Sequence, residues 1–215
     1  MKLTIIGAGP GGYTAAFAAA EKGIEVTLID MAEIGGTCLN RGCIPTKTLR
    51  SSADAVMLAG RLPEYGVETG PAKFCLDTIR KRKDSVIGIL RTGLEKSCSR
   101  LKVRFVSGQA EVLSAKEVLV HTKDGDETVT GDAVIIASGS RVLELPGLTF
   151  DHQYVLNSDD ALSLDRIPAR LCIVGGGVIG CELACIYRAF GSAVTIVEGQ
   201  DRVLPMPSVV KDVGT

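Results

Sequence analysis

The chain has 215 residues, enough for one large domain or two smaller ones, and 46% of them are hydrophobic, which excludes a disordered protein. A net charge of −1 without a long basic run argues against nucleic acid as a main partner. No apolar stretch is long enough to cross a bilayer, and the N-terminus enters a predicted strand at once, so we expect no signal or transit peptide. Seven cysteines without a secretory signal fit a reducing compartment, so we expect a globular protein of the cytoplasm.

The first 30 residues predict a strand, a glycine-rich turn, a helix and a second strand. Gly7, Gly9 and Gly12 form a GxGxxG motif in the turn, and the second strand ends on Asp30. The glycines suit a tight turn, the approach of a pyrophosphate to the backbone, and close packing of helix on strand, while the acid would bind the ribose hydroxyls of an adenosine. The phosphates would lie at the helix N-terminus, where free amides and the macrodipole favour negative charge.

The next stretch, GGTCLNRGCIPTK at residues 35–47, places Cys38 and Cys43 five positions apart. Structural zinc sites commonly use paired CxxC or CxxH ligands, and neither His121 nor His152 belongs to such a pair, so zinc is disfavoured. A structural disulfide would close a loop for which chain entropy gives only roughly 2 kcal/mol, near the low end for disulfides. The pattern therefore favours a redox-active pair over a metal site or a structural staple.

The residues after the cysteine pair predict a helix over residues 44–60 with Pro45 in its first turn. Cys43 would then lie at a helix N-terminus, where the macrodipole favours the thiolate. Lys47 is either an exposed helix residue or a cation near a cofactor. Apolar residues at helical spacing predict a further helix within residues 72–100, whose basic residues are typical of a solvated face.

From residue 101 to residue 134 the pattern changes to alternating apolar and polar residues, and KDGDE is a strong hairpin signal. We expect a small antiparallel meander there. The five cysteines outside the motif are expected to be structural core thiols, and they are Cys75, Cys98, Cys172, Cys181 and Cys185.

Residues 171–198 repeat the strand, turn, helix and strand of the first unit. The turn glycines Gly175, Gly177 and Gly180, and the terminal acid Glu198, each lie 168 positions after their counterparts. Two complete units at one constant offset predict two dinucleotide sites. Because a carboxylate facing the ribose repels a 2′-phosphate, Glu198 favours NAD over NADP at the second site.

The cysteine motif, with GAGPGG before it and GGGVIGCE after it, resembles that of the pyridine nucleotide–disulfide oxidoreductases, and the likeness covers essentially the whole chain. It implies an α/β fold with two Rossmann-like FAD/NAD(P)-binding units, three-layered with a parallel sheet, and an inserted antiparallel β-meander at about residues 101–134. It divides the chain into an FAD-binding domain over residues 1–147 and the first part of an NAD-binding domain over residues 148–215.

The resemblance also implies roles for single residues. The first unit would bind FAD and the second NAD. Cys38 would be the interchange thiol that exchanges with the substrate disulfide, and Cys43 the flavin-side thiol. Lys47 would lie by the flavin and pair with Glu182. Ser138 stands where the family usually has threonine, a change that keeps the hydroxyl. The remaining residues implied in cofactor binding are Gly36, Thr37, Ser138 and Gly139.

Among the family, the chain is most similar to members that oxidise a dihydrolipoyl group with NAD⁺, so the implied partner is a dithiol, free or carrier-bound. Members that reduce glutathione disulfide or mercuric ion share the motif, but Glu198 weighs against their use of NADP. The family pattern continues for about as long again, into a dimerisation domain that supplies a His–Glu pair. We therefore expect a homodimer for the full-length protein, with little turnover by this chain alone, and a flavin-binding module as the alternative.

Overall fold

A computed structural model describes the chain at residues 1–68, 70 and 72–204. It shows the expected α/β class, with parallel and antiparallel sheets. The chain folds into two compact units. The first comprises Met1–Pro45 and Arg82–Asp159, and the second comprises Thr46–Lys81 and the residues from Asp160 onward.

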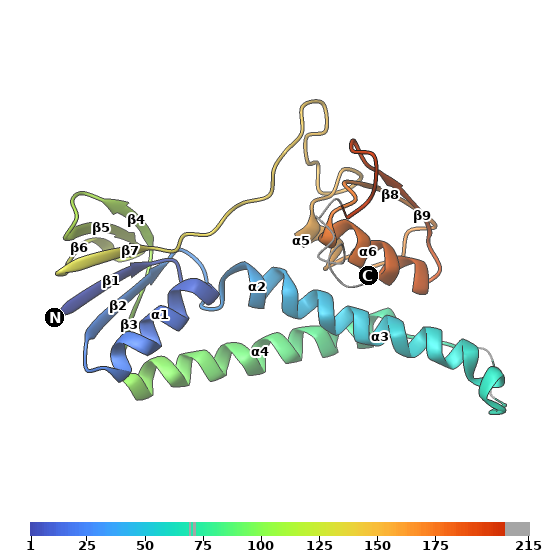
Figure 1. Ribbon diagram of the computed structural model, residues 1–215, viewed down its shortest axis with the longest axis horizontal. Coiled ribbons are helices and arrows are strands. Elements are labelled where there is room, and N and C mark those ends of the chain that lie inside the picture. The colour runs from blue at the N-terminus through green and yellow to red at the C-terminus, as the bar shows by residue number, and fades with distance from the viewer. Residues whose placement is uncertain (69, 71, 205–215) are drawn as a thin grey trace, which may run out of the picture. The chain divides into compact units, whose positions relative to one another are not determined.

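A four-stranded parallel sheet in the order β3-β2-β1-β7 forms the centre of the first unit (Figure 1). Its strands are β1 (Lys2–Ile6), β2 (Glu25–Asp30), β3 (Arg104–Ser107) and β7 (Ala133–Ile136). The helices of this unit are α1 (Pro10–Glu21), α2 (Gly36–Arg41) and most of α4 (Leu76–Leu101). The parallel pairing follows from the helical crossovers, since parallel strands cannot be joined by a tight hairpin.

The first unit has three layers because the strands of its parallel sheet are buried on both faces. On β2, Val26 and Leu28 pack into the core under α1 and α4, whereas Ile29 points to the opposite side. There it meets Val118 and Val120 of the antiparallel sheet, and all three of these residues are fully buried. Because successive side chains of a strand point to opposite faces, β2 contributes residues to the hydrophobic core on each side of the sheet.

The antiparallel sheet contains β4 (Gln109–Val112), β5 (Glu117–Thr122) and β6 (Gly125–Thr130). The predicted meander exists, but its predicted ends at residues 101 and 134 are wrong. Leu101 still belongs to α4, β3 pairs with β2 in the parallel sheet, and Ala133 begins the parallel strand β7. Alternating residues fit a strand in either sheet, so the local pattern did not distinguish the two partners.

His121 on β5 lies between two carboxylates of this sheet. Its Nδ1 is 2.8 Å from Asp126 Oδ1 on β6, and its Nε2 is 3.6 Å from Glu111 Oε2 on β4. The hydrogen bond to Asp126, supported by the charges of both acids, raises the pKa of His121 above its ordinary value.

We expect the stability that His121 contributes to fall as the pH rises. A histidine whose pKa is raised in the folded state contributes fully below its unfolded pKa of about 6.5. That contribution is lost as the pH passes through the higher folded pKa. Urea unfolding of the parent and of His121→Gln, from about pH 5.5 to about pH 9, should show the parent's advantage shrinking over this range and weakening in high salt. A constant difference at every pH would contradict the assignment.

The second unit contains β8 (Arg170–Val174), α6 (Val178–Ala189) and β9 (Ala193–Val197), with β8 and β9 paired in parallel. It also holds nearly all of α3 (Cys43–Arg61) and the 3₁₀ helix η1 (Leu62–Tyr65), while the short helix α5 spans Ser158–Ala161. Tyr187 of α6 donates its hydroxyl hydrogen to the Ala161 carbonyl, and burial raises the pKa of Tyr187 to about 12.

The two units do not divide the chain where the predicted binding domains do. The sequence placed residues 46–81 in a first domain ending at residue 147, but they pack with the second unit. Leu49 and Ala53 of α3 share a core with Leu183 and Ile186 of α6. Hydrophobic spacing shows that a helix has a buried face, not which neighbour covers it. The division into FAD and NAD domains stays a prediction.

The expectation of five core thiols is wrong for most of them. Only Cys98 is buried, Cys181 is half-buried, and the exposed ones are Cys75, Cys172 and Cys185. Cys172 lies on β8. In the described part of the chain, alternate residues of β8 are exposed. Within the same residues, no helix combines the length and apolar character needed to cross a membrane.

Candidate functional site

The first glycine-rich turn leaves the sheet at the end of β1 and requires glycine at two positions. Gly7 has a φ of +101°, and a Cβ there would lie 2.1 Å from the Ala137 carbonyl oxygen. A Cβ on Gly12 would lie 1.7 Å from the Gly7 carbonyl oxygen. A Cβ on Gly7 would also lie 2.9 Å from the Ser138 amide nitrogen, so the loop after β7 adjoins this turn.

The second turn repeats this geometry in the other unit. Gly175 has a φ of +107°, and a Cβ on Gly180 would lie 2.1 Å from the Gly175 carbonyl oxygen. The helices that follow, α1 and α6, have Gly9 and Gly177 as their N-caps, and neither N-cap is reinforced by a side-chain hydrogen bond. Backbone amides at each helix start are therefore left for a ligand.

A carboxylate side chain accepts a hydrogen bond from the backbone of each glycine turn. Asp30 Oδ2 accepts a hydrogen bond from the Ala8 amide, and Glu198 Oε2 accepts one from the Gly176 amide, both at 2.7 Å. The amides of Gly176 and then Gln200 lower the pKa of Glu198, which favours its ionised form. The sequence predicted these two acids as ribose ligands, but not their hydrogen bonds to the turns. The one sequence signal for these bonds was that each acid keeps the same 168-position offset as the turn glycines.

The glycine turns fit the pyrophosphate of a dinucleotide. A Cβ placed on Gly177 would meet no atom within 4 Å, so the front of the second turn is open. In the first unit, a Cβ on Gly36 would lie 2.5 Å from the Gly9 Cα, so the absence of a side chain lets these two backbone segments touch. Gly36, predicted from the sequence as a cofactor residue, thus adjoins the first turn.

The two motif cysteines lie on consecutive helices, and both belong to the first unit. Cys38 is half-buried on α2, and Cys43 is exposed as the first residue of α3. This confirms that Cys43 lies at a helix N-terminus with Pro45 in the first turn. Gly42 separates the helices, and a Cβ there would lie 2.9 Å from the Thr37 carbonyl oxygen. Both cysteines are thiols.

The helix α2 was missed from the sequence because six residues are too few to show a hydrophobic period. Sequence reasoning also missed two residues that hold it. Asn40 and Arg91 form a hydrogen-bonded link between α2 and α4. The only signal was the position of Asn40 between the two motif cysteines.

Lys47 and Glu182 form an ion pair in the second unit, as the resemblance implied. Lys47 Nζ lies 2.7 Å from Glu182 Oε1, with side chains 60% and 27% exposed. A pair this open to water contributes at most about 1 kcal/mol to stability. The place of Lys47 beside a flavin stays a prediction.

The other predicted cofactor residues lie on exposed backbone of the first unit. Thr37 is exposed on α2, while Ser138 and Gly139 lie in the loop after β7, with Gly139 at a φ of +71°. No group of three or more potential metal ligands, of the types His, Cys, Asp and Glu, occurs in the described ranges.

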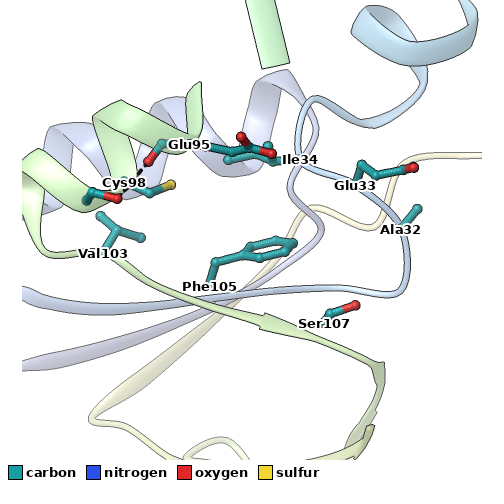
Figure 2. A pocket seen from close by; sticks show the side chains of 9 residues that line it. Ala32, Glu33, Ile34, Glu95, Cys98, Val103, Phe105 and Ser107 are labelled. Atoms are coloured by element: carbon teal, nitrogen blue, oxygen red, sulfur yellow. Dashed lines mark hydrogen bonds between the residues drawn. The ribbon is translucent and has the colours of Figure 1, made fainter. Parts of the chain in front are cut away.

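A cavity of about 420 Å³ in the first unit opens near the end of β2 (Figure 2). Figure 2 shows Cys98 and Glu95 reaching it from α4, with Phe105 and Ser107 on β3. Ser107 is paired with Asp30 in the β2–β3 register, so the cavity adjoins the acid of the first turn. Burial raises the pKa of Cys98, which keeps it a neutral thiol.

Known proteins match this arrangement over almost the whole chain. The family model described as pyridine nucleotide-disulphide oxidoreductase matches residues 1–214. The dihydrolipoyl dehydrogenase of Bacillus subtilis is 44% identical over 207 residues, which is 95% of this chain and 45% of that protein. The dihydrolipoyl dehydrogenase of Buchnera aphidicola is 43% identical over 213 residues, covering 99% and 44%.

Two solved structures are also similar. The crystal structure of LpdA from Mycobacterium tuberculosis superposes with a TM-score of 0.87 at 29% identity, covering 96% of this chain and 46% of that one. The HOCl-induced flavoprotein disulfide reductase RclA from Escherichia coli gives 0.80 at 32% identity, covering 95% and 43%. The chain thus spans less than half the length of the relatives that it matches. The family resemblance inferred from the cysteine motif is confirmed.

Proposed function

Because the chain belongs to the pyridine nucleotide–disulphide oxidoreductase family, we propose that it carries the two nucleotide-binding units and the redox cysteine pair of an enzyme resembling dihydrolipoyl dehydrogenase. The dihydrolipoyl dehydrogenases of this family use FAD and NAD(H). The observation that carries the proposal is that the same glycine turn occurs twice, once before and once after the cysteine motif. In each turn a backbone amide donates a hydrogen bond of 2.7 Å to a carboxylate oxygen. The proposed reaction oxidises a dihydrolipoyl dithiol with NAD⁺.

The residues of the first unit would hold FAD, and those of the second NAD. The amides at the start of α1 would bind the pyrophosphate, with Gly36, Thr37, Ser138 and Gly139 on the adjoining backbone. FAD, when bound, supplies two-electron transfer between a dithiol and a nicotinamide. In the second unit Glu198, ionised at neutral pH, would accept from ribose hydroxyls and repel a 2′-phosphate, which favours NAD over NADP.

The cysteines supply the thiol–disulfide exchange. A thiolate of the substrate attacks the Cys38 sulfur of the oxidised pair, the bond between Cys38 and Cys43 breaks, and Cys43 leaves as a thiolate. Cys43 is the exposed first residue of α3, so its sulfur is open to solvent when it leaves. The second substrate thiol then displaces Cys38, so the substrate leaves as a cyclic disulfide. The cysteine pair has gained two electrons, and the substrate protons pass to solvent.

The identity of the substrate rests on the relatives rather than on the geometry. Two relatives at 44% and 43% identity are named dihydrolipoyl dehydrogenase, which supports a lipoyl group, free or carrier-bound, as the dithiol. The cytoplasmic location expected from the sequence stays a prediction. The homodimer expected from the sequence stays a prediction.

The test combines cofactor binding with turnover by the purified chain. We expect saturable quenching of FAD fluorescence. When dihydrolipoamide and NAD⁺ are added we expect only slow NADH formation, well below that of a full-length relative, with NADP⁺ a poorer acceptor. FAD binding without turnover would instead support the flavin-binding module, since the chain spans less than half of its relatives. NADPH-dependent reduction of glutathione disulfide or mercuric ion would support the other members of the family. Failure to bind either nucleotide would contradict the proposal.

A further inference from the structure

Arg91 of α4 is tied to the helix that carries the interchange cysteine. Its Nε and Nη2 donate hydrogen bonds to Asn40 Oδ1 at 3.1 and 2.8 Å. Its Nη1 also lies 3.6 Å from Glu33 Oε1. The Arg91 side chain is 30% exposed. Two donors of one planar guanidinium therefore converge on one oxygen, in a place where water competes only in part.

The amide group of Asn40, oriented in this way, points its nitrogen into the preceding turn. Asn40 Nδ2 lies 3.3 Å from the Glu33 carbonyl oxygen, and 3.1 Å from those of Ile34 and Gly36. The turn that these carbonyls surround has positive φ at Gly35 (+111°) and Gly36 (+57°). A backbone of this kind needs outside contacts to hold it, and the Asn40 side chain supplies them.

This turn connects two parts of the proposed site. Gly36 touches Gly9 of the first glycine turn and is also the first residue of α2. Cys38 follows two residues later, and Asn40 two residues after that. A six-residue helix is not stable alone, so contacts outside α2 decide where Cys38 lies.

We propose that Arg91 is a positioning residue for the redox pair. By orienting Asn40 it fixes the turn and α2, and through them the place of Cys38 relative to Cys43. The inference rests on the proposed redox function of these two cysteines. Lysine at position 91 could supply the charge and one hydrogen bond, but not the planar fork.

The experiment measures the thiol–disulfide equilibrium of the whole chain in glutathione buffers. One glutathione disulfide takes two electrons from the cysteine pair, giving two glutathione thiols and the Cys38–Cys43 disulfide, so atoms and electrons balance. Losing hydrogen bonds to a charged group frees α2, and we expect Arg91→Met to lower the equilibrium constant for the protein disulfide about tenfold. That change makes the reduction potential about 30 mV less negative. Arg91→Lys should recover roughly half of the shift on a logarithmic scale.

Two controls separate positioning from a general loss of stability. Arg100→Met removes an exposed arginine from the same helix and should leave the potential unchanged. In an Asn40→Ala background, Arg91→Met should change the equilibrium less than about twofold, because coupled residues are not additive. Urea unfolding identifies the conditions in which each variant is folded. If Arg91→Met does not fold, the milder Arg91→Lys variant is measured in its place.

The outcomes distinguish this inference from the proposed function. If the parent forms the disulfide but both Arg91 variants keep its potential, the positioning role is wrong and the redox pair stands. An undiminished Arg91→Met effect in the Asn40→Ala background would also overturn the inference, since Arg91 would then act by another route. If the parent pair does not form a disulfide in any glutathione buffer, the redox function itself fails.

Discussion

Cys43→Ser should stop the reaction with glutathione disulfide after its first step. In the parent chain the neighbouring thiol resolves the mixed disulfide within one molecule, so two glutathione thiols are released for each glutathione disulfide consumed. Because a neighbouring group acts at a high effective concentration, we expect the second release to slow by at least about 1,000-fold in the variant. The measurement is rapid quenching followed by counting of released glutathione and mass spectrometry of the trapped adduct on Cys38.

The matched control is Cys172→Ser, which removes another exposed thiol, on β8 of the second unit. It should release both glutathione thiols at the parent rate. A second release from Cys43→Ser at the parent rate would show that a different cysteine resolves the adduct, and would contradict the pairing of Cys38 with Cys43.

Gly12→Ala should disrupt the first unit. The added Cβ would lie 1.7 Å from the Gly7 carbonyl oxygen, and backbone cannot move aside as a flexible side chain can. We expect a loss of about 3 kcal/mol or more in the free energy of unfolding, together with the loss of FAD binding. Urea unfolding and FAD fluorescence quenching measure the two effects.

Two other glycines make this prediction specific. Gly93 lies in α4 with open space around its Cβ position, so Gly93→Ala should stabilise the chain by about 0.5–1 kcal/mol. Gly180→Ala, whose Cβ would lie 2.1 Å from the Gly175 carbonyl oxygen, should abolish NAD binding and leave FAD binding in place. A Gly12→Ala variant with parental stability would mean that α1 can move away from β1.

The hydrogen bonds from the turn amides to Asp30 and Glu198 give these two acids a second role. From the sequence, Asp30 and Glu198 were ribose ligands alone. In the structure each also accepts an amide hydrogen bond from its turn, so a carboxyl side chain helps to shape the loop that would receive the phosphates. A carboxylate has several acceptor positions, so one acid can bind the turn and the ribose together.

The sequence by itself determined the features that depend on a few neighbouring residues. Glycines that must adopt positive φ marked both turns, and Pro45 marked the start of the helix at Cys43. The constant offset between the units predicted a repeat that the structure shows in detail. These signals are local because the conformations available to glycine and proline are set by their own covalent geometry.

Only the tertiary structure decided which distant groups meet. It placed β3 in the parallel sheet, packed α3 with α6 in the second unit, and brought Arg91 to Asn40, 51 positions earlier in the chain. Each of these pairings depends on the whole packed core, because an amphipathic face or a long polar side chain fits many neighbours equally well. The residues that we propose to bind the nucleotides and to exchange electrons could therefore be identified from the sequence. The contact that we propose to position the cysteines could not.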